Sequence, residues 1–142
     1  MSSSYLSMKC LSLKQPYAYL LASGKKTIEL RNWNTRFRGK FLIHSSKNVD
    51  SKRSKFLGID HRMLTQGAII GIALLYDVKQ YKDKVELEAD YHKHYADTKK
   101  FGSCKYGFMV ENANRFQNPI PYRGKSNFFE VVDPIIKSLL YI

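Results

Sequence analysis

The sequence predicts a single α+β domain, built as a small mixed β-barrel with short helices packed around it. Short segments with strand-like alternation of apolar and polar residues recur along the chain, and helical segments stand between them. The apolar run over residues 68–76 is typical of a buried central strand. No internal repeat or linker divides the 142 residues. We therefore expect one domain over residues 1–142, with residues 1–7 as a flexible N-terminal extension.

The first elements are a strand and a helix that end in a turn. Residues 8–13 predict the first strand. Pro16 suits the first turn of a helix, and Tyr17 and Leu20 form part of its apolar stripe. Gly24 ends this helix, because glycine accepts the left-handed conformation found at helix ends.

The next segment, residues 27–31, alternates strictly and predicts a strand. Ile28 and Leu30 would face the core, while Glu29 and Arg31 share the other face. Residues two apart on a strand lie roughly 6.6 Å apart at the backbone. Glu29 and Arg31 can therefore form an ion pair or bind one ligand together, and Lys26 stands at the entrance of this strand.

The remaining elements follow from the same rules. Residues 40–44 predict a strand, residues 50–57 a helix capped by Asn48 or Asp50, and residues 60–64 a helical turn. After the central strand, residues 83–100 predict a polar helical excursion. We then expect a strand over residues 105–111, an irregular return over residues 112–122 marked by Pro119 and Pro121, and a last strand over residues 126–132.

Positive charge is concentrated in the first half of the chain. The net charge is +12, and residues 1–66 carry 13 Lys and Arg against 3 Asp and Glu, whereas residues 67–142 carry 11 against 9. A field of this sign suits a phosphate-bearing partner, because Lys and Arg neutralise phosphates and release their counterions. A solvated surface that keeps the protein soluble is the alternative explanation.

Other classes of protein are not indicated. No apolar run is long enough to cross a bilayer, and the N-terminus has no secretory signal, so we expect a cytoplasmic or nuclear protein without membrane contact. Cys10 and Cys104 are too few for a disulfide scaffold, so we expect reduced thiols. His92 and His94 lie two apart without a third ligand, so we expect no metal and no cofactor.

The run from residue 10 to residue 46 resembles the ASCH domain, the activating signal cointegrator homology domain of the PUA-like superfamily. The family signature GxKxxExR falls on Gly24, Lys26, Glu29 and Arg31. Further matching elements are Gln15-Pro16, Trp33 with Thr35, and Arg38-Gly39, with looser matches over residues 68–76 and 119–124. The resemblance implies a PUA-like barrel and a cleft beside the signature that binds RNA or a related ligand.

The residue types near the signature suit nucleic-acid binding on their own account. Basic side chains can hold phosphates, Trp33 can stack on a base, and Glu29 can accept from a base amino group. RNA or another single-stranded nucleic acid is the expected partner, and DNA is possible. The predicted binding residues are Lys26, Glu29, Arg31, Trp33, Arg36, Arg38 and, on the helix that follows, Lys52, Arg53 and Lys55. In the alternative explanation, Glu29 and Arg31 brace the fold and Trp33 caps the core.

A hydrolase is the second functional hypothesis. Some small ASCH proteins resemble amidohydrolases of acetylated cytidine. In those enzymes a lysine that matches Lys26 of this chain acts with a threonine at the position that Glu29 occupies here, and with a distant glutamate. Lys26 could be a nucleophile if burial lowered its pKa, with Glu29 as proton carrier. A ribonuclease would need a general base, for which His44 is the candidate.

Overall fold

The computed structural model describes residues 7–99, 105–132 and 134–140. Ser7 is the first residue of strand β1, and the rest of the predicted N-terminal extension lies outside the described residues. Cys10 is a buried free thiol, whereas Cys104 lies outside the described residues. In the part of the chain that the structure covers, no helix is long and apolar enough to cross a membrane.

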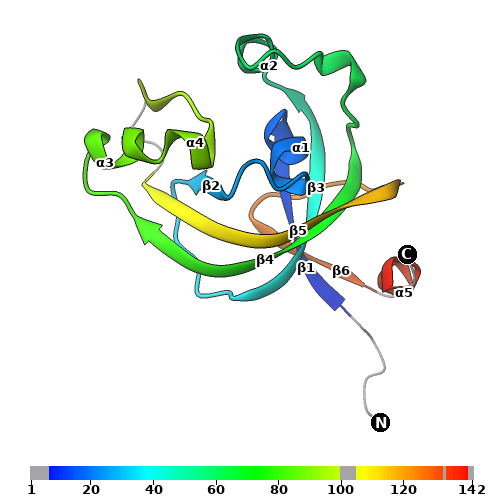
Figure 1. The fold of residues 1–142 in the computed structure, drawn as a ribbon. Coiled ribbons are helices and arrows are strands. Elements are labelled where there is room, and N and C mark those ends of the chain that lie inside the picture. Colours follow the sequence, from blue (N-terminus) through cyan, green and yellow to red (C-terminus); the bar gives the residue numbers. More distant parts are fainter. Residues whose placement is uncertain (1–6, 100–104, 133, 141–142) are drawn as a thin grey trace.

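One six-stranded sheet organises the fold, with the strand order β2-β5-β4-β3-β1-β6 (Figure 1). Strands β1 and β3 are parallel, and every other neighbouring pair is antiparallel. The strands are β1 (Ser7–Gln15), β2 (Ile28–Arg31), β3 (Gly39–Val49), β4 (Ala68–Gln80), β5 (Tyr106–Pro121) and β6 (Phe128–Val132). Strand β4 lies between β3 and β5, as expected for the central apolar run.

The sheet curves but does not close, so the predicted barrel is wrong. Closure would need a ladder between the edge strands, whereas β2 pairs with β5 and β6 pairs with β1. Aromatic contacts span this gap instead: the ring of Trp33 lies 5.2 Å from that of Phe108 on β5 and 5.9 Å from that of Phe128 on β6. Phe37, from the same loop, contacts Phe128 at 5.1 Å. Side chains therefore take the place of backbone hydrogen bonds at this seam.

Strand β5 is longer than the sequence predicts. The segment 112–122 was expected to be an irregular return, but it continues the strand as far as Pro121. Three register shifts along the β4–β5 ladder, together with the left-handed Asn112, absorb the irregular stretch without ending the pairing. On its other edge, β5 pairs with β2 only as far as Met109. Proline lacks a backbone N–H, but at Pro119 that edge is beyond the ladder with β2, so no hydrogen bond of this ladder is lost.

Short helices lie over and around the sheet (Figure 1). Helix α1 (Tyr17–Ala22) buries Ala18, Leu20 and Leu21 against it, and Gly24 follows with a φ of +82°. Helix α2 (Ser51–Phe56) begins after Asp50, whose carboxylate caps the amide of Arg53. The remaining helices are the 3-10 turn η1 (His61–Met63), α3 (Lys84–Ala89), α4 (Tyr91–His94) and α5 (Ile135–Leu140).

Helices α3 and α4 are fixed to the sheet by a buried polar group. Asp90 accepts a hydrogen bond from the Tyr81 hydroxyl at 2.6 Å and one from Lys79 at 2.9 Å. The backbone amide of Thr27 also donates to the carbonyl of Lys93, at the end of α4. These contacts hold α4 beside the strand that carries Glu29 and Arg31.

Candidate functional site

The carboxylate of Glu29 lies between two cations. Its Oε1 is 3.1 Å from Nζ of Lys26, and its Oε2 accepts a hydrogen bond from Nε of Arg31 at 2.8 Å. The structure thus brings Glu29 and Arg31 together on one face of β2, as the alternation predicts. We refer to these three residues as the charged triad.

Lys26 is buried rather than extended over the entrance of the strand, with only 2% of its surface exposed. Its ammonium group donates to the carbonyl oxygens of Ile28 at 2.6 Å and of His94 at 2.9 Å, in addition to its contact with Glu29. An ammonium group has three N–H donors, one for each of the two carbonyl oxygens and one for the carboxylate. The geometry therefore holds Lys26 as a charged ion within the protein.

Glu29 is ionised in this setting. Burial alone would raise the pKa of its carboxyl group, but the charges of Lys26 and Arg31 and the hydrogen bonds they donate hold the pKa below its usual value of 4.5. Both carboxylate oxygens are engaged by the two cations. Glu29 therefore has the features of a fixed anion, not of a base ready to take a proton.

A cleft of about 630 Å³ opens beside the charged triad. It lies beside the open side of the sheet, because its lining includes residues of β1, of β2 and of the segment before β6. Residues of β3 and of the segment after α4 line it as well. The guanidinium of Arg31 crosses this opening and donates to the carbonyl of Ser12 on β1 at 2.9 Å. The ionic and polar residues that line this motif cleft include Lys14, Lys26, Glu29, Arg31, Asn32, Asn48, Asp50, Asp97, Lys125 and Ser126.

A second cleft, of about 820 Å³, adjoins the first. We call it the basic cleft, and its lining includes Ser12, His44, Ser46, Lys47, Gly67, Tyr122, Arg123, Gly124, Lys125 and Ser126. Ser12, Ser46, Lys125 and Ser126 line both clefts. The two hollows therefore meet along one shared border.

His44 lies beneath this border, and both of its ring nitrogens are occupied. Nε2 lies 2.7 Å from the carbonyl oxygen of Tyr122, which can only accept, so Nε2 carries the hydrogen. In the neutral ring Nδ1 then accepts from the hydroxyl of Ser12 at 2.8 Å. Burial lowers the pKa of His44 below 6.5, which favours this neutral form.

Three residues predicted to bind nucleic acid lie on the loop after β2, outside the lining of both clefts. Trp33 is half-buried in the aromatic seam. Arg38 donates to the carbonyl oxygens of Thr35 and Phe37 and lies 3.8 Å from Asp77. Arg36 is exposed on the same loop. The structure therefore separates these side chains from the charged triad.

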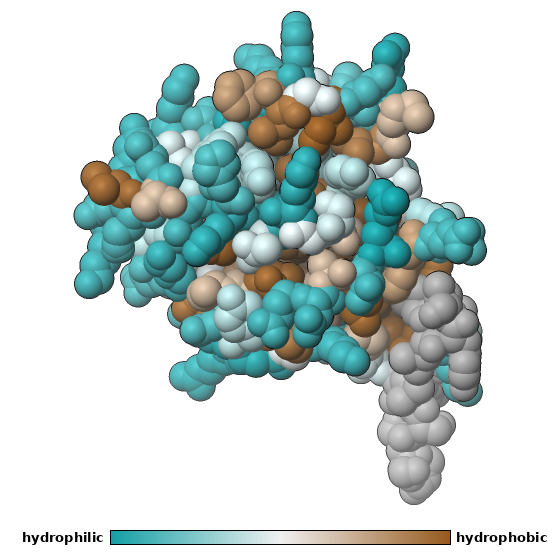
Figure 2. Space-filling model, viewed as in Figure 1, coloured by the Kyte–Doolittle hydropathy of each residue, from teal (hydrophilic) through white to brown (hydrophobic). Residues whose placement is uncertain are grey.

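The three basic residues predicted on α2 divide into two kinds. Lys52 and Lys55 are exposed, whereas Arg53 is half-buried and contacts Asp97 at 4.0 Å and the Tyr91 hydroxyl at 3.3 Å. Through Asp97, Arg53 supports one wall of the motif cleft. Hydrophobic residues also gather over α2 and the segment that follows (Figure 2), where Phe56 and Met63 are 73% and 82% exposed.

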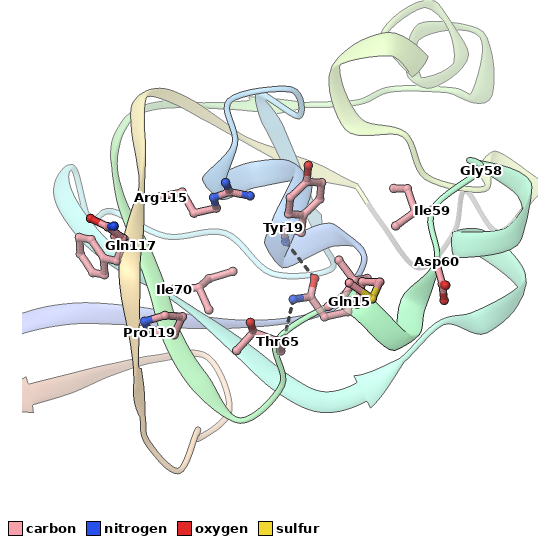
Figure 3. A pocket seen from close by; sticks show the side chains of 13 residues that line it. Gln15, Tyr19, Gly58, Ile59, Asp60, Thr65, Ile70, Arg115, Gln117 and Pro119 are labelled. Atoms are coloured by element: carbon pink, nitrogen blue, oxygen red, sulfur yellow. Dashed lines mark hydrogen bonds between the residues drawn. The ribbon is translucent and has the colours of Figure 1, made fainter.

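A third cleft, of about 790 Å³, lies on another side of α1 (Figure 3). Tyr19 lines it, while Tyr17 lines the motif cleft, because residues two apart on a helix point in nearly opposite directions. Gln15 braces this cleft by accepting from the amide of Tyr19 and donating to the carbonyl of Thr65. Its lining shares no residue with the charged triad.

His94 has a structural role in the described chain. Its Nε2 bonds the carbonyl of Leu87 at 2.8 Å, and its Nδ1 accepts from the amide of Ala96 at 3.0 Å. Burial lowers its pKa below 6.5, and the nearby charge of Lys26 lowers it further. Among the described residues, no three His, Cys, Asp or Glu side chains gather as a metal site would require.

Several lining residues are not apparent from the sequence alone. Ser12 and Lys14 share one face of the first strand, so alternation places them together but does not show that this face meets β2. Arg123 and Lys125 flank Gly124 in a segment that the sequence marks only by its prolines and glycine. Long-range pairing brings both sets to the clefts.

Comparisons with known proteins identify the fold and the family. A structure of an ASCH protein from Zymomonas mobilis matches with a TM-score of 0.67 and 16% identity, covering 94% of each chain. Two variants of that protein, one with a serine replaced by alanine and one with a tyrosine replaced by phenylalanine, match with TM-scores of 0.66. Their identities are 17% and 16%, and they cover 94% of this chain and 94% and 96% of their own.

A search among curated proteins found no match. The family model of the ASCH domain matches residues 11–135, which is most of the chain. That match includes the charged triad, the motif cleft and the basic cleft. The chain therefore belongs to the ASCH domain family.

Proposed function

We propose that this protein binds single-stranded nucleic acid, with RNA as the first candidate, at the motif cleft. The observation that carries the proposal is the mixed lining of this cleft, where cations, carboxylates and amides face one hollow of about 630 Å³. A nucleotide needs such a mixture, because its phosphate is an anion and its base edge carries both donors and acceptors. The volume is within the usual range for small-ligand sites.

The exposed members of the lining are the groups available to a ligand. Lys14 and Lys125 are exposed cations that can meet phosphate, and the amides of Asn32 and Asn48 can both donate and accept. Tyr17 presents a half-buried ring at the same cleft. The charged triad forms a fixed floor beneath these groups, and it contributes electrostatic field more than free donors.

The hydrolase alternative gains no support from these contacts. A nucleophilic Lys26 would have to be neutral, yet its ammonium group donates to three acceptors. The carboxylate of Glu29 is held by two cations. His44 would have to offer a free ring nitrogen to act as a general base, and both of its nitrogens are engaged. We therefore propose binding without catalysis by these residues.

Fluorescence anisotropy tests the proposal with random-sequence single-stranded RNA, single-stranded DNA and duplex RNA. Lys14→Ala removes an exposed cation of the motif cleft, and Lys40→Ala removes an exposed cation of β3 about 20 Å farther along that strand than Ser46. We expect Lys14→Ala to weaken single-strand binding and Lys40→Ala to leave it close to wild type. Equal binding by both variants, or tighter binding of duplex than of single strand, would contradict the proposal.

A further inference from the structure

We infer that the basic cleft holds the phosphates of the same strand whose base occupies the motif cleft. The ligand would then be an unpaired strand of several nucleotides, with its base and its adjoining backbone in two different hollows. This inference rests on the proposed function and specifies which form of nucleic acid the protein takes.

The charges of the two clefts match a ligand whose phosphates lie in the basic cleft and whose base lies in the motif cleft. Lys47, Arg123 and Lys125 line the basic cleft, and its lining contains no Asp or Glu. The motif cleft combines its cations with the carboxylates of Glu29 and others. A hollow in which every Lys, Arg, Asp or Glu of the lining is a cation suits phosphate, whereas a hollow lined by both signs of charge suits the donors and acceptors of a base.

The shared border gives the strand a continuous path. Lys125 lines both clefts, so one exposed cation stands where a backbone would pass from one to the other. Ser12, Ser46 and Ser126 complete the border, and their small hydroxyl side chains can donate to phosphate or sugar oxygens. Apart from Lys125, the residues that the two linings share are these serines.

The wall that carries Arg123 and Lys125 is fixed in place. The Tyr122 carbonyl accepts a hydrogen bond from His44, just before this segment. At Gly124 the backbone lies so close to His44 that an added Cβ would come within 2.5 Å of Cε1 and 3.0 Å of the Ser12 oxygen. A backbone held in this way removes the cost of ordering the segment at binding and leaves only the side chains to be ordered, which favours affinity. His44 therefore acts here as a positioning residue.

The arrangement selects an unpaired strand. A base can enter the motif cleft only if it has left its partner and its stack, which is the state of bases in single strands. Inorganic phosphate or pyrophosphate is the other source of the same anionic chemistry at the basic cleft. Pyrophosphate is therefore a separate ligand in the test.

The test uses the double variant Lys47→Ala/Arg123→Ala, which removes two cations that line only the basic cleft. Its control is Lys40→Ala/Lys84→Ala, which removes the same charge from exposed positions outside both linings. A pool of RNA hexanucleotides is titrated by anisotropy between about 50 and 200 mM salt. The four nucleosides, which lack phosphate, and pyrophosphate are titrated by NMR.

We expect the Lys47/Arg123 variant to bind hexanucleotides on the order of tenfold more weakly than the control and to lower the salt slope by about 1.4, since each lost phosphate contact on a single strand contributes about 0.7. Nucleoside binding should be the same in both variants. Equal hexanucleotide affinity in the two variants overturns the inference while leaving base binding at the motif cleft in place. Pyrophosphate binding as tight as hexanucleotide binding overturns it in favour of a free-anion site. Wild-type protein that binds neither nucleosides nor hexanucleotides overturns the proposed function itself.

Discussion

Arg31 reaches Glu29 and the backbone of Ser12 with one guanidinium group, at 2.8 Å and 2.9 Å respectively. The first contact lies within β2, and the second crosses from β2 to β1, where the sheet has no ladder. Arg31 therefore orients the triad carboxylate and also ties the two sides of the motif cleft together.

Replacing Arg31 should destabilise the protein, because its side chain makes two contacts. Arg31→Ala removes both contacts, and we expect it to lower the free energy of unfolding by about 2–3 kcal/mol, since Lys26 still partners Glu29. Arg31→Lys keeps the charge but lacks the planar fork, so it should recover only part of the loss. Urea denaturation of both variants measures this. An Arg31→Ala protein as stable as wild type would show that neither contact matters for the fold.

Replacing Lys26 should have a larger effect on stability. Lys26→Ala leaves the buried carboxylate of Glu29 with one cation and leaves the carbonyls of Ile28 and His94 without their lysine donor. Loss of one partner of a buried pair costs about 3–5 kcal/mol. Melting temperature and RNA affinity should be measured on the same samples. Unchanged melting with lost affinity would mean instead that Lys26 contacts the ligand directly.

Trp33 should contribute to stability and not to binding. Its ring packs edge-on against Phe108 and Phe128, and it lines neither the motif cleft nor the basic cleft. Trp33→Ala should cost about 2–4 kcal/mol, below the upper range for a fully buried tryptophan, and Trp33→Phe should cost less. Affinity per folded molecule, corrected for the unfolded fraction, should match wild type. A clear drop in that corrected affinity would restore Trp33 as a stacking partner.

Stability should fall as the pH drops below about 6.5. Burial depresses the pKa of His44 and of His94 in the folded protein, so the unfolded chain binds more protons below the ordinary value of 6.5. Stability then rises with pH in that window, and the histidine contribution is lost as the pH falls through it. Glu29 adds a second loss at lower pH, below its ordinary 4.5, because its folded pKa is also depressed. Urea midpoints between about pH 7.5 and pH 5.5 measure the first loss.

The matched variant for this pH dependence is His44→Gln, which can still donate to the Tyr122 carbonyl but does not titrate. Its stability should change less with pH over the same range, and its residual slope should come from His94. A slope identical to that of wild type would show that His44 does not contribute.

The protein should not hydrolyse acetylated cytidine efficiently. The resemblance to the amidohydrolases implies a threonine where this chain has Glu29. Here Lys26 is instead held as an ammonium ion by that glutamate and two carbonyls. Incubation of purified protein with acetylcytidine, followed by chromatography, should show no turnover above buffer. Rapid deacetylation that is lost in Glu29→Gln, with the fold intact, would make the enzyme hypothesis primary.

The sequence predicted local structure well and distant contacts poorly. Alternation alone placed Glu29 beside Arg31, and Gly24 marked the end of α1, because both depend on near neighbours. The barrel and the end of β5 were wrong, since closure and pairing depend on how strands meet in space. His44 and Tyr122 meet across 78 residues, which no local period reveals.

The burial of Lys26 illustrates the same limit in the candidate site. A lysine just after a glycine turn is normally exposed, and its acceptor on His94 is 68 residues away. Only the packing of α4 beside β2 makes that acceptor available. The basic cleft was missed for the same reason, although Arg123 and Lys125 could be read from the sequence as charges.

The aromatic seam between the two sheet edges has a dynamic consequence. A hydrogen-bonded closure would have to break its ladder in order to widen, whereas contacts among Trp33, Phe37 and Phe128 can slide with the backbone intact. We expect amide hydrogen exchange to be faster along β2 and β6 than along β3 and β4 at the centre of the sheet. Since β2 also supplies one wall of the motif cleft, opening at the seam would let that cleft adjust its width to bases of different size.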